Sequence, residues 1–197
     1  FALSEIMVIS QNDSSLKANP WAVAGYYDML KDGSFGSYED LLTNVTIHPS
    51  MAIYLSHLRN KMETVDDQGE VISSPDENYA REVMQLLSIG LVELHTNGTV
   101  ALDASGLPQV TYTQTDITEL ARVLTGWAYA ATTEDNGVTN TVIENIRFTF
   151  NGYSKDNQNY YHPYFTTSLK MFEDNGLDAS HGGYARYHDN GQKTVLE

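Results

Sequence analysis

The sequence predicts a mainly α protein with a helical core, one β-hairpin and a C-terminal segment rich in strands and loops. Apolar residues recur at helical spacing through most of residues 1–127, between recognisable start and stop signals. Asn97-Gly98 joins two short alternating stretches and is the strongest short-range signal for a hairpin. Beyond Trp127 the composition shifts towards Thr, Asn and Gly. We therefore expect a helical core segment at 1–127 and a strand- and loop-rich segment at 128–197, packed on the same domain.

Six helices are expected, each marked by a capping residue, an early proline, a terminating glycine or a regular apolar face. Their expected ranges are 1–9, 20–31, 38–47, 49–62, 74–90 and 116–126. The hairpin is expected at 92–102, and residues 142–150 alternate like a half-buried strand. We see no internal repeat. The first helix lacks a start signal, so we expect the chain to be a segment of a longer protein.

The sequence is strongly acidic. Its 197 residues include 26 Asp and Glu against 11 Lys and Arg, which gives a formal net charge of −15. Such a charge disfavours nucleic acid and anionic membrane surfaces as partners. It fits either simple solubility or cation binding, and a divalent cation is the cofactor that this balance would suggest.

Composition excludes several classes of site. A hydrophobic content of 41% indicates a folded globule rather than a disordered chain. There is no cysteine, which excludes disulfides, thiolate catalysis and Cys-ligated metals. No apolar run reaches the roughly 18 residues of a membrane-spanning helix. The His-Glu-x-x-His, glycine-rich phosphate-loop and Gly-x-Ser-x-Gly motifs are absent as well.

Glu82 is the best chemical clue in the sequence. It lies in the predicted helix 74–90, where Ser74 and Glu77 have the spacing of a capping box and Gly90 follows the last turn. Glu82 falls on the apolar side of this helix, where a carboxylate needs a hydrogen-bond donor, an opposite charge or a metal. We predict that Glu82 is buried and close to His188 or to a basic side chain. Glu77 should lie nearer the N-terminal end of the helix.

Three histidines are candidates for chemistry. His48 precedes Pro49 at a helix start, so both turn capping and ligand binding are open to it. His57 falls on the polar side of helix 49–62, and we expect it at the surface. His188 is followed by Asp189 and Lys193 around a C-terminal turn.

Blocks of sequence along nearly the whole chain occur in a characteristic order. They include Tyr26-Tyr27-Asp28-Met29-Leu30, His48-Pro49-Ser50-Met51, Asp76-Glu77-Asn78-Tyr79-Ala80-Arg81-Glu82, Tyr112-Thr113-Gln114-Thr115-Asp116-Ile117, Ala121-Arg122-Val123-Leu124-Thr125-Gly126-Trp127 and His188-Asp189 with Lys193-Thr194. Together these blocks resemble the bacterial domain of unknown function 1800 (DUF1800) family.

The resemblance implies a mostly helical protein that is usually exported, and hence a periplasmic or extracellular location. It also implies a sulfatase-like partner protein, because members are often encoded beside that family. It brings no settled activity. Other branches carry histidines in the helix near Leu3, but this sequence has Leu3-Ser4-Glu5-Ile6 there, which gives no basis for a metal site on those histidines.

Two function hypotheses follow. The first is an enzyme or metalloprotein, with Glu82 as a general base or oxygen ligand and His188 as an imidazole ligand or proton shuttle. Its further binding residues would be Glu77, Arg81, His48, Asp189 and Lys193.

The second hypothesis is a cell-envelope or extracellular binding or structural module without catalytic activity. Its aromatic residues Tyr160, Tyr161 and Tyr164 would then contact glycan or a partner. A third interpretation of Glu82 involves no site at all: the carboxylate would pair with a cation such as Arg122 or Lys193 in a buried network that specifies the fold.

Overall fold

The computed structural model describes residues 1–128, 133–135, 138–140, 169–171 and 187–196. Helices account for most of the regular structure, and the strands are short. The helices are α1 Ala2–Ile6, α2 Ser14–Lys17, α3 Pro20–Asp32, α4 Tyr38–Thr46, α5 Pro49–Tyr54, α6 Asn78–Gln85 and α7 Gln114–Val123. The strands are β1 Thr64–Val65, β2 Val71–Ser73, β3 Trp127–Ala128, β4 Thr133–Asp135, β5 Val138–Asn140 and β6 Lys170–Met171.

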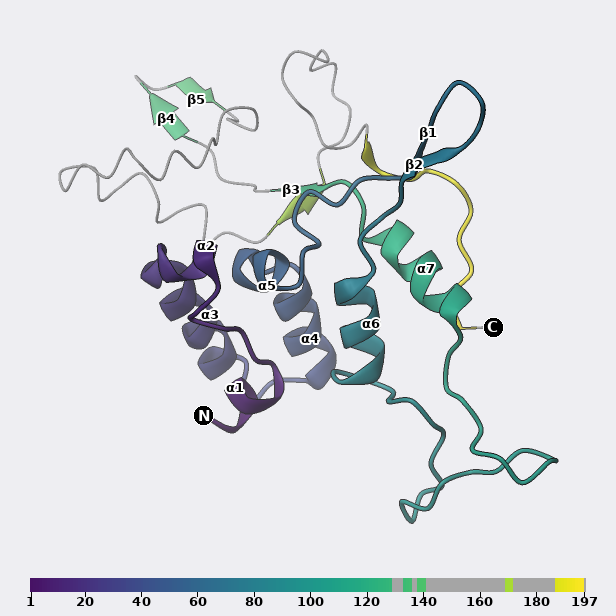
Figure 1. Cartoon of the computed structure of the whole chain (residues 1–197). Coiled ribbons are helices and arrows are strands. Elements are labelled where there is room, and N and C mark those ends of the chain that lie inside the picture. The colour runs from purple at the N-terminus through teal and green to yellow at the C-terminus, as the bar shows by residue number, and fades with distance from the viewer. Residues whose placement is uncertain (129–132, 136–137, 141–168, 172–186, 197) are drawn as a thin grey trace.

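The seven helices of the described residues share one hydrophobic core, as the sequence predicted. Figure 1 shows α3, α5, α4, α6 and α7 following one another across the molecule. Contacts join α3 to α5, α4 to α5 and α6 to α7. The largest fully buried apolar side chains are Tyr26, Tyr79, Met7, Leu16, Met51 and Val45. None of the described helices is both long and apolar enough to cross a membrane.

Helix starts follow local capping chemistry, although two caps differ from prediction. Ser37 caps α4 as expected, by accepting a hydrogen bond from the Asp40 amide at 3.0 Å. The capping box of α7 is formed by Thr113 and Asp116, one turn earlier than predicted. The box predicted for Ser74 is wrong, because α6 begins only at Asn78.

The turn at residues 55–60 explains where α5 ends and α6 begins. Ser56 and Arg59 adopt left-handed φ angles of 65° and 61°, so the helix predicted to reach residue 62 stops at Tyr54. The Asn60 side chain then brackets the backbone of Asp76, donating to its carbonyl at 2.9 Å and accepting from its amide at 2.8 Å. These two bonds fix the chain two residues before α6.

His57 lies inside this turn and is buried, so the prediction of a surface histidine was wrong. Its Nε2 lies 2.8 Å from the Thr46 carbonyl, and its ring stacks on Tyr79 with centroids 4.1 Å apart. The helical wheel failed because helix 49–62 does not continue to His57, and the turn rotates this residue inwards. Burial lowers the pKa of His57 to about 4.

The chain between α6 and α7 forms an arm, residues 91–111, that projects away from the helices (Figure 1). The predicted Asn97-Gly98 turn is present, with Gly98 at a φ of 82°. The two legs form only an isolated bridge, Leu94 with Val100, instead of continuous strands. A third leg, which the sequence analysis did not anticipate, makes bridges from Leu102 to Pro108 and from Val92 to Val110.

The three legs close on one another. The Glu93 amide donates to the Gln109 carbonyl at 2.8 Å, the Gln109 amide to Ala101 at 3.0 Å, and the Ala101 amide to Glu93 at 2.9 Å. Along the chain these residues are spaced eight positions apart. The turn bond from Gly98 to His95 also repeats eight residues later, from Gly106 to Asp103. The arm is therefore a closed, threefold-like ring built on an eight-residue repeat, and the expectation of no repeat was wrong.

Parts of the C-terminal segment return to the helices. Leu169 is buried in the common core, and its amide donates to the Ile47 carbonyl at 2.7 Å. Strands β3 and β6 pair antiparallel, and so do β4 and β5. The strand predicted at 142–150 and the residues Tyr160, Tyr161 and Tyr164 lie outside the described residues.

We expect acid to destabilise the fold through His48 and His57, whose pKa values burial lowers to about 4. An unfolded histidine has a pKa of about 6.5, so only the unfolded state gains protons as the pH falls from 6.5 to 4, and the free energy of unfolding decreases over that window. The loss from pH 7 to pH 5 should be about 2 kcal/mol for each histidine. Urea unfolding at both pH values measures it.

The matched variants for this experiment are His57→Gln and His95→Gln. The glutamine in the first variant keeps a donor for the Thr46 carbonyl but does not titrate, so the pH-dependent loss should fall by about half. His95 is exposed on the arm, and its replacement should leave the loss unchanged. An unaltered pH dependence in the His57 variant would show that this histidine is not held neutral.

Candidate functional site

Helix α7 carries a line of polar side chains on the face next to the one that buries Ile117 and Ala121. Gln114, Thr118 and Arg122 follow one another at intervals of four residues, so they lie on one face of the helix. This face meets two partners. One is the start of α6, and the other is the extended segment 187–196, which we call the strap.

Glu77 joins the start of α6 to α7. Its carboxylate accepts hydrogen bonds from Thr118 Oγ1 at 2.7 Å, Gln114 Nε2 at 2.8 Å and Arg81 Nη2 at 3.1 Å. Arg81 also donates to Gln114 Oε1 at 3.3 Å. Two of the predicted binding residues, Glu77 and Arg81, thus lie together, and Glu77 is the residue directly before the helix.

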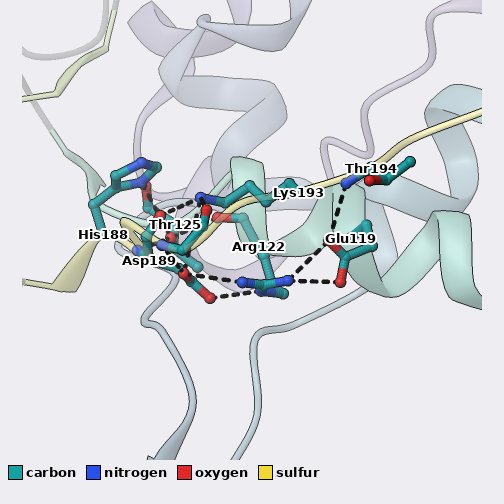
Figure 2. A network of polar contacts seen from close by, with 8 residues as sticks. Glu119, Arg122, Thr125, His188, Asp189, Lys193 and Thr194 are labelled. Carbon is teal, nitrogen blue, oxygen red and sulfur yellow. Dashed lines mark hydrogen bonds and ion pairs between the residues drawn. The ribbon is translucent and has the colours of Figure 1, made fainter.

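Arg122 joins α7 to the strap by forming ion pairs with two carboxylates (Figure 2). Its Nε and Nη2 donate to the two oxygens of Asp189, at 2.6 and 3.2 Å. Its Nη1 donates to both oxygens of Glu119, at 2.6 and 2.8 Å. Such two-pronged pairs combine charge with fixed geometry and are among the strong polar contacts of proteins.

Lys193 completes this cluster. Its Nζ donates to the Asp189 carbonyl and, at 2.9 Å, to the Gly191 carbonyl, and it lies 3.8 Å from Asp189 Oδ1. We call the four residues Glu119, Arg122, Asp189 and Lys193 the latch. Their charges balance, two negative against two positive.

Backbone amides of the strap also bind the carboxylates of α7. The Thr194 amide donates to Glu119 Oε2 at 3.3 Å, as Figure 2 shows, and the Leu196 amide donates to Asp116 Oδ1 at 2.8 Å. The strap therefore follows α7 from its last turn back to its first, held by polar contacts along the way.

His188 is held at the end of α7 by Thr125. The buried Thr125 hydroxyl donates to the Arg122 carbonyl at 2.7 Å and accepts from the Asp189 amide at 2.9 Å. His188 Nδ1 lies 2.8 Å from the Thr125 carbonyl oxygen. A carbonyl can only accept, so Nδ1 carries the proton in the neutral ring. The Nε2 atom is then the basic nitrogen, which could take up a proton or bind a metal.

Gly126 permits this close approach. Its φ is 84°, and a Cβ atom at this position would lie 2.7 Å from the Cβ of His188. The sequence analysis assigned Gly126 only to the end of the helix. The structure adds that the strap passes directly over it.

Pairing keeps the latch ionised. The Arg122 guanidinium holds the pKa of Asp189 down to about 2, and its two carboxylate partners raise the pKa of Arg122. A carboxyl with a depressed pKa stabilises the fold above its unfolded pKa of about 4, here by about 2 kcal/mol, and loses this contribution as the pH falls to 2. Asp189 and Arg122 therefore stay ionised throughout the neutral range.

A pocket of about 420 Å³ lies between the two junctions. Glu77 and Asp189 both line it, so the structure brings these two predicted binding residues to one pocket. The remaining lining residues are Glu63, Ser74, Pro75, Thr118, Glu119, Ala121 and Arg122. Nowhere in the described part of the chain do three or more His, Asp or Glu side chains converge to hold a metal ion.

A family model described as a protein of unknown function (DUF1800) matches residues 1–197. The chain belongs to this family. Comparisons of this DUF1800 chain with curated proteins and with solved structures gave no match.

Glu82 of the DUF1800 chain does not join either junction. It is half-buried, and its carboxylate forms no hydrogen bond or ion pair with a described residue. The buried face of α6 is centred on Tyr79, Ala80 and Met84, while Leu86 is 65% exposed. At about 100° per residue, Glu82 lies more than a quarter-turn from the middle of that face. The prediction of a buried, paired Glu82 was therefore wrong.

His48 lies apart from the latch and caps α5, which was one of the two roles left open for it. Its Nδ1 accepts a hydrogen bond from the Ser50 amide at 3.1 Å. Its ring packs edge-on against Tyr26, with centroids 5.1 Å apart. The buried setting leaves it neutral, and its ring serves as a structural element of the core.

Sequence reasoning missed Glu119 and Thr125 and gave Arg122 the wrong partner. Arg122 was considered only as a counter-ion for Glu82. The signal that could have found them is the family block Ala121 to Trp127, read together with His188-Asp189. A separation of 63 residues between Thr125 and His188 concealed the contact.

We expect Arg122→Ala to lower the free energy of unfolding by about 2 kcal/mol, because it leaves the half-buried Asp189 and Glu119 without their cation. Glu82→Gln is the control and should change stability by less than about 0.5 kcal/mol, because Glu82 has no described partner. Urea unfolding measures both. Tryptic cleavage after Lys193 should also speed up in the Arg122 variant. Equal destabilisation by the two substitutions would show that Glu82 does form a stabilising polar contact.

Proposed function

We propose that this protein is an exported bacterial binding module of the cell envelope, acting in the periplasm or outside the cell, and that the arm binds a protein partner. The observation that supports the proposal is the exposure of large aliphatic side chains along the arm. These residues are Leu91, Leu94, Val100, Leu102, Leu107 and Val110. Large contiguous apolar patches on a soluble protein commonly mark interaction sites.

The latch supports a binding role rather than catalysis. Asp189, Glu119 and Lys193 are occupied by contacts to one another and to Arg122, and Glu77 already accepts three hydrogen bonds. A catalytic carboxylate needs a lone pair that can reach the substrate. The latch instead supplies what a binding module requires, since it fastens the strap to α7 and α7 follows directly from the arm.

An enzyme or metalloprotein is the second candidate, and the pocket between Glu77 and Asp189 is the observation that favours it. Glu63 lines this pocket, and no described residue pairs with it. Elemental analysis of the purified protein tests this candidate. A stoichiometric divalent cation that is lost in Glu63→Gln would favour it over the binding module.

We propose as the partner a sulfatase-like protein of the kind often encoded beside members of this family. We expect the two purified proteins to form a complex in isothermal titration calorimetry. Replacing Leu94, Leu102 and Val110 together by Thr should weaken it at least tenfold, because anchor residues of an interface each contribute more than about 1 kcal/mol. Thr preserves the β-propensity of the arm.

Ile72→Thr is the matched control. Ile72 is an exposed aliphatic residue of β2, outside the arm, and its replacement should leave the affinity unchanged. Equal binding by the arm variant and the parent protein would contradict a docking role for the arm.

A further inference from the structure

The arm presents an equivalent aliphatic residue from each of its three legs. Leu94, Leu102 and Val110 are eight residues apart, and their side chains are 60%, 59% and 60% exposed. Their equal exposure follows from the threefold-like closure of the ring, in which each leg has the same relation to the next. All three positions are therefore open to a partner that meets the arm.

Closure of the ring also limits how a partner can bind. The amides of Glu93, Ala101 and Gln109 and their carbonyls are all used inside the ring. The outer amides of His95, Asp103 and Thr111 are paired within the arm as well, with Thr99, Leu107 and Leu91. Only short stretches of backbone on each leg are left for a partner strand to extend, which disfavours β-strand addition and favours side-chain contact as the means of recognition.

The charges on the arm indicate which kind of partner can cover its apolar side chains. Residues 91–111 contain no Lys or Arg, and Glu93 and Asp103 are their only Asp or Glu. A second copy of this chain would bring another net charge of −15 to the interface, and anionic lipid would add like charge. A basic surface would instead attract the arm and speed its association.

Building on the proposed function, we infer that the arm docks on a protein surface whose apolar centre receives Leu94, Leu102 and Val110 and whose rim carries Lys or Arg facing Glu93 and Asp103. Aliphatic anchors in an apolar centre with a complementary charged rim are the usual anatomy of a specific interface.

Site-specific photo-crosslinking in the producing cells tests this inference. The full-length protein would carry p-benzoylphenylalanine in place of Leu94, Leu102 or Val110, one at a time, with replacement of the exposed Glu39 on α4 as the control. We expect all three arm positions to crosslink to one protein, through neighbouring apolar peptides with Lys or Arg close by. The control position should not reach that protein.

A charge-neutral variant separates this inference from the proposed function. Glu93→Gln with Asp103→Asn keeps the side-chain sizes, and the second substitution retains an amide oxygen to accept from the Ser105 and Leu107 amides, as the Asp103 carboxylate does. We expect the crosslink yield to fall at least threefold. An unchanged yield to a protein partner would keep the binding module but overturn the basic rim. No crosslink above the control would overturn both, and crosslinks to lipid, to the same chain or to a second copy would overturn the inferred protein surface with a basic rim.

Discussion

The fold depends on the hydrogen bonds that the backbone and the Asn60 side chain of the 55–60 turn make to residues before α6 and after α7. Asn60 holds the backbone of Asp76 with both atoms of its amide group, and its own carbonyl accepts from Gly126 at 2.9 Å. The Arg59 amide donates to the Trp127 carbonyl at 2.8 Å. One turn thus sets where α6 begins and where the chain leaves α7. Buried backbone groups must find such partners, so the turn and both helices constrain one another.

The latch extends this constraint to the C-terminal part of the chain. The Arg122 guanidinium lies between Glu119 from its own helix and Asp189 from the strap, and Thr125 and Gly126 form the surface on which His188 rests. Because each of these carboxylates is held by charge-assisted hydrogen bonds, the cluster gives the strap one position along α7. Its polar groups are consumed in holding the structure, which is why the candidate site fits a scaffold better than a reaction centre.

The arm satisfies its backbone polar groups in a different way. It has no sizeable core, and Ala101 is the one buried residue in residues 91–111. Its stability comes from a closed cycle of backbone hydrogen bonds and from turns capped by Asn97 and Asp103. Because backbone hydrogen bonds close the ring, the aliphatic side chains are not needed to form an internal core. They remain on the surface of an element that α6 and α7 hold at its base, and this arrangement suits recognition of a partner.

The sequence by itself determined the helical class, the common core, the Asn97-Gly98 turn, the start of α4 and the family, because these features rest on contacts within a few residues or on blocks of adjacent residues. It also contained the eight-residue repeat, in Val92, Val100 and Pro108 and in Leu94, Leu102 and Val110, although only the closed ring made that spacing meaningful. The tertiary structure alone decided that His57 is buried, that Glu82 has no partner among the described residues and that Arg122 pairs with Asp189. A wheel assumes that a helix continues and that its neighbours lie on the side with the most apolar residues. The first assumption fails for His57, because the left-handed φ angles at Ser56 and Arg59 show that helix α5 has already ended. The second fails for Glu82, because α6 buries the face that carries Tyr79, Ala80 and Met84.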